Sequence, residues 1–335
     1  MTELILNVSV ALIPVLFFLS VLVFLDSYKL VKLRSILSYI AIGCCTAALL
    51  FMLFQLFPSI PTTSVLYMRY GAPIIEESLK ACFLIYLLRN QKIGFMVDAA
   101  IVGFALGAGF ALLENVYYLE SLHKTNLLLW IIRGFGTAVM HGGSTAIVGV
   151  VSKNLSDVKD STSFLIFLPG LAIGIAIHSL FNHFILPPVA STIIVVVSLP
   201  VFMLIAFARS ERATREWLGV GFDNDAELLT IVTTGGIGTA RIGHYLDSVQ
   251  SKFRGEVVAD MLCYLRLYLE LAIQAKGILL MRESGFSVEP DPNVQAKFDE
   301  MTYLQKSIGK TGLLALSPFL RTSNRDLWQM HTLKK

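Results

Sequence analysis

Carboxylate, imidazole, ammonium and amide side chains interrupt several long apolar stretches of this chain. They are Glu76, Glu77, Lys80, Glu114, His141, His178 and Asn182. An ionised side chain near the centre of a membrane helix costs about 3 kcal/mol, so such groups are kept mostly where they pair, bind or transfer protons. Glutamate and histidine are also frequent proton donors and acceptors in catalysis. The set therefore predicts a polar site inside an apolar environment.

The spacing of the acidic pair limits what each glutamate can contact. Adjacent residues of a helix point about 100° apart, so Glu76 and Glu77 cannot both face one point squarely. Lys80 follows them by four and three residues and can pair with either. One interpretation is a neutralised ion pair that only fixes helix packing. The other is that one glutamate pairs while its neighbour faces a wet cavity as a general base.

The other polar residues lie on separate apolar stretches. His141 is followed by two glycines, which leave space beside its ring. His178 and Asn182 are four residues apart and so share one helical face. Arg133 is expected to extend outward to the membrane interface. Ser144 lies one turn from His141, but this spacing is too common to indicate a serine nucleophile.

Seven apolar runs reach the roughly 20 residues that a membrane-spanning helix needs. They lie near 4–25, 36–58, 65–88, 94–118, 128–151, 163–186 and 189–208. The composition agrees, since 55% of the 335 residues are hydrophobic and only 15% are charged. The predicted fold class is all-α, a polytopic membrane helix bundle of about seven transmembrane helices.

Charge divides the chain into two parts. Residues 1–208 hold 11 of the 27 Lys and Arg and 9 of the 24 Asp and Glu, although they make up most of the chain. We therefore predict a transmembrane domain over 1–208, with its core at 65–186, and a helical tail over 209–335. The tail is expected to be regulatory or to form a homo-oligomer. The net charge of +3 is too small to indicate a nucleic-acid partner.

Basic residues between the predicted spans fall mostly on one side of the bilayer. That side carries Lys29, Lys32, Arg34, Arg89, Lys92, Lys153, Lys159, Arg209, Arg212 and Arg215, and the other carries Arg69 and Lys124. The positive-inside rule then predicts an outside N-terminus and a cytoplasmic tail. The expected location is the cell (inner) membrane, where the lipid bilayer surrounds residues 1–208.

The ordered motifs resemble those of the PrsW family of intramembrane proteases. The resemblance is carried by Glu76-Glu-x-x-Lys80, Phe110-x-x-x-Glu114-Asn115, glycine-flanked His141 and His178-x-x-x-Asn182, and covers residues 65–186. That family is similar to the type II CAAX-prenyl proteases. The resemblance implies cleavage of a single-span membrane protein, such as an anti-sigma factor.

For such a reaction the residues suggest a water molecule activated by glutamate. Glu76 or Glu77 would be the base, with Lys80 and Glu114 setting its charge. His178 and Asn182 would donate to the oxyanion, and His141 would orient water or protonate the leaving amine.

Two alternatives remain beside this metal-free mechanism, which is favoured and needs no cofactor. In the first, zinc is bound by Glu77, Glu114, His141 and His178, or with Glu76 in place of Glu77. In the second, the protein is a non-catalytic membrane scaffold whose polar residues hold helices together.

Overall fold

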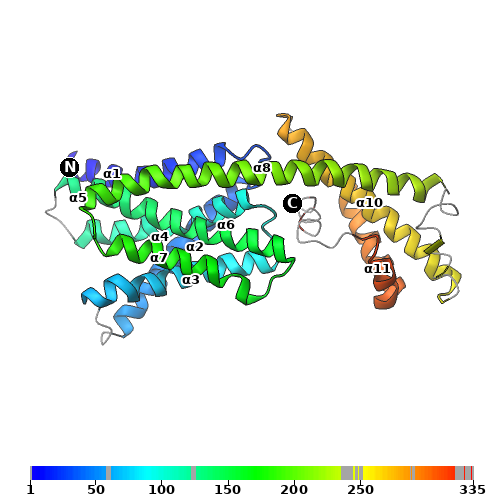
Figure 1. Ribbon diagram of the computed structural model, residues 1–335, viewed down its shortest axis with the longest axis horizontal. Coiled ribbons are helices and arrows are strands. Elements are labelled where there is room, and N and C mark those ends of the chain that lie inside the picture. The colour runs from blue at the N-terminus through cyan, green and yellow to red at the C-terminus, as the bar shows by residue number, and fades with distance from the viewer. Residues whose placement is uncertain are drawn as a thin grey trace. The chain divides into compact units, whose positions relative to one another are not determined.

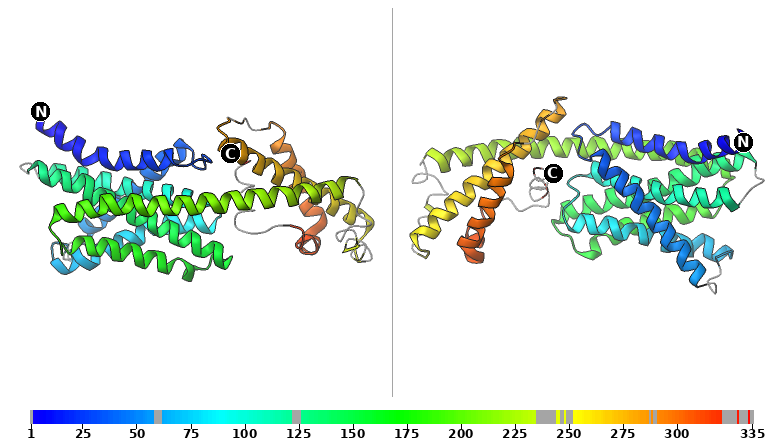
Figure 2. Two further views of the ribbon diagram at one scale, coloured as in Figure 1. Left: turned by 45° about the horizontal axis from the view of Figure 1, so that its top comes forward. Right: turned by 180° about the vertical axis from the view of Figure 1, so that it is seen from behind.

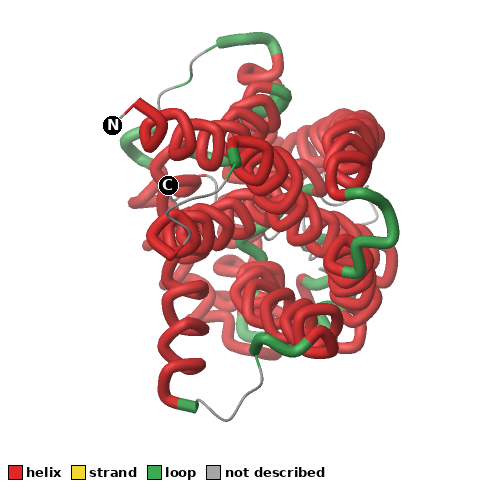
Figure 3. The backbone as a smooth tube through the Cα atoms, turned by 90° about the vertical axis from the view of Figure 1, so that its left-hand side faces the viewer, coloured by secondary structure: helices red, strands yellow, loops and turns green. Residues whose placement is uncertain are grey.

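The computed structural model describes residues 2–57, 62–121, 126–234, 252–286 and 291–320, together with positions 244, 245, 248, 288, 328 and 333. Throughout these residues the regular elements are helices, without a strand (Figure 3). The α-helices are α1 (Thr2–Phe24), α2 (Leu33–Leu56), α3 (Ala72–Arg89), α4 (Met96–Ser121), α5 (Leu127–Ile131), α6 (Ala138–Lys159), α7 (Leu168–Asn182), α8 (Pro188–Thr234), α10 (Gly255–Glu283) and α11 (Val294–Leu316). The predicted all-α class is confirmed.

Short helical segments of other types precede three of these helices. The π-helical segments η1 (Tyr67–Gly71) and η2 (Ile132–Thr137) lead into α3 and α6, and the 3-10 segment η3 (Phe164–Ile166) precedes α7. π-helical turns are rare and occur frequently at functional sites. The helices that follow the two π-helical segments, α3 and α6, are therefore candidates to carry functional residues.

The chain forms two compact units, residues 1–211 and 212–335. Helix α8 begins in the first unit and ends in the second. The last predicted span, 189–208, is thus only the apolar beginning of a longer helix. Hydropathy falls after 208, but helix formers such as Ala213, Glu216 and Leu218 continue the helix.

Helix α4 is the centre of the first unit. It packs against α6, α2 and α1, and the same helices lie side by side in Figures 1 and 2. Phe104 and Ala105 in its middle are completely buried. Gly107 allows the close approach to α6, because a Cβ atom there would lie 2.2 Å from the carbonyl oxygen of His141. This contact fixes His141 against α4.

Among the residues that the structure describes, six helical segments are long and apolar enough to cross a membrane, by length and composition. They are Ile5–Phe24, Leu33–Leu56, Met96–Leu119, Leu127–Lys159, Phe164–Asn182 and Pro188–Thr234. The chain is therefore a multi-pass membrane protein. The third predicted span, 65–88, is not among the six. It folds as η1 and α3, and Glu76, Glu77 and Lys80 lower its apolar content.

The second unit has a core of its own. Helix α10 packs against α11, and Met261, Leu265 and Leu269 on α10 are buried. Buried Lys276 forms an ion pair with Asp225 at the end of α8. The apolar face of α10 is thus buried within the unit itself.

Candidate functional site

Helix α3 carries the acidic pair and the lysine. Pro73 fits the first turn of the helix, where a missing amide hydrogen costs nothing. Glu77 and Lys80 face the bundle and are 0% and 1% exposed. The Lys80 ammonium nitrogen lies 2.6 Å from Glu77 Oε1, an ion pair at the three-residue spacing of the sequence. The structure thus pairs Lys80 with Glu77.

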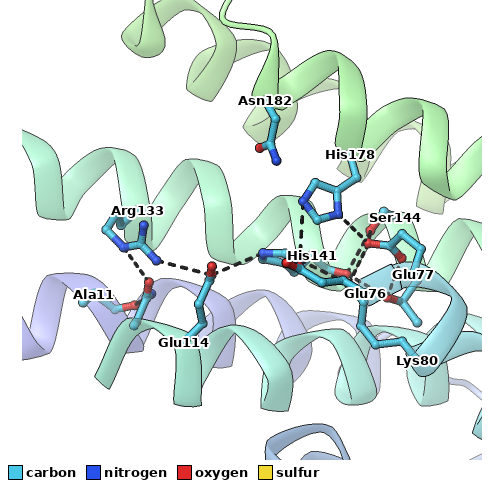
Figure 4. A network of polar contacts seen from close by, with 12 residues as sticks. Ala11, Glu76, Glu77, Lys80, Glu114, Arg133, His141, Ser144, His178 and Asn182 are labelled. Atoms are coloured by element: carbon cyan, nitrogen blue, oxygen red, sulfur yellow. Dashed lines mark hydrogen bonds and ion pairs between the residues drawn. The ribbon is translucent and has the colours of Figure 1, made fainter. Parts of the chain in front are cut away.

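The Glu77 carboxylate receives further hydrogen bonds from two other helices (Figure 4). From α6, Ser144 Oγ donates to Oε1 over 3.1 Å, and Thr145 Oγ1 donates to Oε2 over 3.4 Å. From α7, His178 Nδ1 lies 2.9 Å from Oε1. Because an ionised carboxylate can only accept, His178 Nδ1 carries the proton and Nε2 keeps its lone pair. Glu77 is therefore a fixed acceptor that joins α3, α6 and α7.

His141 lies between a cation and a second carboxylate. Its Nδ1 is 3.2 Å from Lys80 Nζ, and its Nε2 is 3.3 Å from Glu114 Oε2 on α4. Its ring meets the ring of His178 edge to face, with 4.7 Å between the ring centroids. The fold thus brings imidazoles from α6 and α7 into direct contact.

Glu76 contributes an oxygen without a hydrogen bond from the described residues, as Glu114 does. Its Oε2 lies 4.0 Å from His178 Nε2 and has no hydrogen bond from any residue that the structure describes. The side chain is only 12% exposed. A buried polar atom without a partner costs free energy, so it usually marks the position of a water, an ion or a reacting group.

Asn182 has a different environment from the other predicted site residues. It shares a face of α7 with His178, but its side-chain amide donates to the carbonyl oxygen of Met68 over 3.0 Å. Ser179 also donates to η1, at the carbonyl oxygen of Arg69 over 2.7 Å. The Asn182 side chain therefore connects α7 to η1.

Arg133 is a residue that sequence reasoning missed. Instead of extending to the interface, it turns into the site, where Nη2 lies 3.3 Å from Glu114 Oε2. Its Nε donates to Asn115 Oδ1 over 3.0 Å. The sequence does not reveal this because a helical arginine near the end of an apolar stretch reaches the interface as easily as a buried acid. Ser144 and Thr145 were missed as partners of Glu77 for a similar reason, since hydroxyls are common in helices.

The formal charges of the group do not balance if all of its carboxylates are ionised. With neutral imidazoles, three glutamates (Glu76, Glu77 and Glu114) face two cations (Lys80 and Arg133), which leaves a formal charge of −1. A buried charge needs compensation, either by a shared proton or by a bound cation.

The donor atoms fit a metal ion. Glu76, His141 and His178 each offer one ligand atom, and these atoms lie within 4.8 Å of one another. Two histidines and a glutamate form one of the ligand sets of catalytic zinc sites. His178 also faces a carboxylate, that of Glu77, with Nδ1, which leaves Nε2 for a metal, as in most metal-bound histidines.

The composition of this group differs from the main zinc set expected from the sequence, which contained Glu77 and Glu114. Glu77 instead contacts Nδ1 of His178, and Glu114 contacts Nε2 of His141. The group contains Glu76, as in the second form of the predicted zinc set, in which this residue replaces Glu77.

Comparison with known proteins gives one match. No curated protein and no solved structure matches the chain. A family model described as PrsW family intramembrane metalloprotease matches residues 32–207, slightly more than half of the chain. The matched segment contains all the predicted site residues, whereas α1 and the second unit lie outside it. The chain therefore belongs to the PrsW family of intramembrane metalloproteases.

Proposed function

We propose that this protein is an endopeptidase that hydrolyses a peptide bond of a single-span, membrane-anchored protein. The family supports the reaction class. The observation that carries the proposal is the free Oε2 of Glu76 beside the fixed imidazole of His178. The expected substrate resembles an anti-sigma factor, as the motif resemblance implies.

Glu76, His141 and His178 would hold a zinc ion in this proposal. Zinc bound there would activate a water molecule and polarise the scissile carbonyl group. The ligand set and the family description support zinc over the metal-free mechanism.

Glu77 acts by orienting His178. Its Oε1 accepts the Nδ1 proton of His178, so the Nε2 lone pair faces Glu76. Lys80 neutralises Glu77 and keeps it an acceptor. Glu114 Oε2 lies 3.3 Å from His141 Nε2 and Lys80 Nζ lies 3.2 Å from Nδ1, so these two groups hold the His141 ring from its two sides.

In the metal-free alternative, hydrolysis needs a glutamate base for the attacking water, and Glu76 is the better of the two adjacent glutamates for this role. The oxygens of Glu77 are already occupied by Lys80, His178, Ser144 and Thr145. The water proton taken by Glu76 is later delivered to the leaving amine, while the hydroxide bonds to the carbonyl carbon. Asn182, with its amide engaged by Met68, is proposed to dock η1 onto α7 instead of donating to the oxyanion.

A non-catalytic scaffold is the second candidate. The observation in its favour is that Glu77 joins α3, α6 and α7 through buried hydrogen bonds. A substitution of Glu76 distinguishes the peptidase from the scaffold, because the free oxygen of this residue contributes little to packing.

We further propose that the protein lies in the cell (inner) membrane with the second unit in the cytoplasm, and that this unit regulates cleavage or forms a homo-oligomer. The distribution of basic residues between the spans supports this orientation.

The proposed function is tested by co-expression with a library of single-span membrane proteins. The wild-type protein and Glu76→Gln are compared for new substrate fragments. Fragments that appear only with the wild-type protein support the peptidase. Identical fragment patterns, with both proteins present at equal levels in the membrane, support the scaffold.

A further inference from the structure

Arg133 has the same relation to Glu114 that Lys80 has to Glu77. Arg133 Nη2 lies 3.3 Å from Glu114 Oε2, and the same oxygen lies 3.3 Å from His141 Nε2. On the other side of the site, Lys80 contacts Glu77 Oε1, which lies 2.9 Å from His178 Nδ1. The site thus contains two rows of cation, carboxylate and imidazole (Figure 4).

The guanidinium group of Arg133 is held from several directions. Nε donates to Asn115 Oδ1 over 3.0 Å, and the guanidinium carbon lies 3.8 Å from the ring centroid of Tyr118. The side chain is only 13% exposed. A planar guanidinium can hold an amide, a carboxylate and an aromatic ring together, which an ammonium cannot do.

This arrangement depends on α1, which lies outside the segment matched by the family. Asn115 Nδ2 donates to the carbonyl oxygen of Ala11 over 2.8 Å. Next to Arg133, a Cβ atom on Gly134 would lie 1.9 Å from the carbonyl oxygen of Val10, so η2 packs directly on the α1 backbone. Helix α1 therefore supports the residue that holds Arg133.

Loss of Arg133 would leave Glu114 as a largely buried carboxylate without its cation. Lys80 does not replace it, because its ammonium group is bonded to Glu77 and His141 Nδ1. Without Arg133, the ion pair that holds Glu114 Oε2 beside His141 Nε2 is lost, and the carboxylate can turn away from the ring. His141 then loses the neighbour that fixes its ring on this side.

We propose that Arg133 is a positioning residue for the peptidase reaction, which holds Glu114 against His141 and thereby fixes the orientation of the His141 ring. The proposal rests on the proposed function. Arg133 acts through Glu114 and touches neither the substrate nor the metal.

The kinetic test uses purified full-length protein with a cleaved single-span substrate. Arg133→Gln is expected to lower kcat by about 10- to 100-fold, the usual effect of losing a partner of a metal-bound histidine, with KM within about twofold. Arg133→Lys restores the charge and should recover part of kcat. Arg89→Gln, the same change at the exposed end of α3, is the control and should leave both constants unchanged.

A double substitution tests whether Arg133 acts through Glu114. The variant with both Arg133→Gln and Glu114→Gln is expected to be no slower than Glu114→Gln alone. The proposal would be overturned if the two losses of kcat multiplied in the double variant. It would also be overturned if Arg133→Gln raised KM and left kcat unchanged. An Arg133→Lys variant as slow as Arg133→Gln while it stays folded would overturn it as well.

Zinc binding separates failure of this proposal from failure of the proposed function. Competition with a zinc chelator is expected to show about 10-fold weaker binding by Arg133→Gln than by Arg89→Gln. If the wild-type protein cleaves nothing, the proposed function fails, and this binding measurement still tests the positioning of His141. Equal zinc affinities of the two variants would refute it.

Discussion

The two nitrogens of His178 face adjacent glutamates of α3. Nδ1 lies 2.9 Å from Glu77 Oε1, and Nε2 lies 4.0 Å from Glu76 Oε2. Glu77 is completely buried and hydrogen-bonded, whereas Glu76 keeps an oxygen without a partner among the described residues. Neighbours in the sequence therefore have different roles, and substitutions should separate them.

Glu76→Gln is expected to abolish cleavage while the protein still folds. The amide is a poorer zinc ligand than the carboxylate and cannot accept a proton, and the loss of a general base alone lowers rates by about 10²- to 10⁴-fold. Folding should change little, because Oε2 makes no hydrogen bond to the described part of the chain. Fragment yield and thermal unfolding in detergent measure the two effects. A Glu76→Gln variant that cleaves normally would contradict the assigned role.

Lys80→Met is expected to destabilise the fold. It leaves the Glu77 carboxylate buried without its cation, and breaking a buried ion pair in this way costs about 3–5 kcal/mol. Thermal unfolding in detergent measures the loss. Exposed Lys92→Met is the matched control and should unfold like the wild-type protein. Equal stability of the two variants would mean that the pair is not needed for folding.

Removal of zinc is expected to stop cleavage without unfolding the protein. We expect one zinc ion per chain in purified protein, lost on treatment with a chelator, with activity restored by added zinc. His178→Ala should bind much less zinc, because it removes one of three ligands. Full activity in excess chelator, with no zinc measured in the protein, would favour the metal-free mechanism instead.

Asn182→Ala distinguishes helix docking from oxyanion stabilisation. Loss of the hydrogen bond to Met68 should cost about 1 kcal/mol of stability, and Ser179 still connects α7 to η1. The docking role predicts less than a 10-fold fall in kcat. A fall of about 10²- to 10³-fold would instead assign Asn182 to the oxyanion. Single-turnover cleavage by the purified variant measures the difference.

Local spacing was sufficient to predict part of the site. Lys80 follows Glu77 by three residues, and a helix brings such residues together wherever it packs. Long apolar runs likewise predicted most of the helices, because apolar stretches of this length are stable as helices in a bilayer. Helix α3 does not meet the criterion of length and apolar composition, because it carries Glu76, Glu77 and Lys80.

Contacts between helices were not predictable in the same way. Whether Glu76 or Glu77 meets Ser144 and His178 depends on how α3 is rotated in the bundle, and the sequence of one helix does not set that rotation. Arg133 illustrates the same point, because its inward direction depends on η2 and on contacts with α4.

By itself, the sequence determined that this is a helical membrane protein with buried acids and imidazoles of the PrsW type, because residue type and helical spacing are local properties. Only the tertiary structure decided that Glu77 is hydrogen-bonded while Glu76 keeps an oxygen without a partner among the described residues. It also decided that Arg133 belongs to the site. Those assignments depend on close backbone approaches such as that of Gly107 to His141, which exist only once the helices have packed.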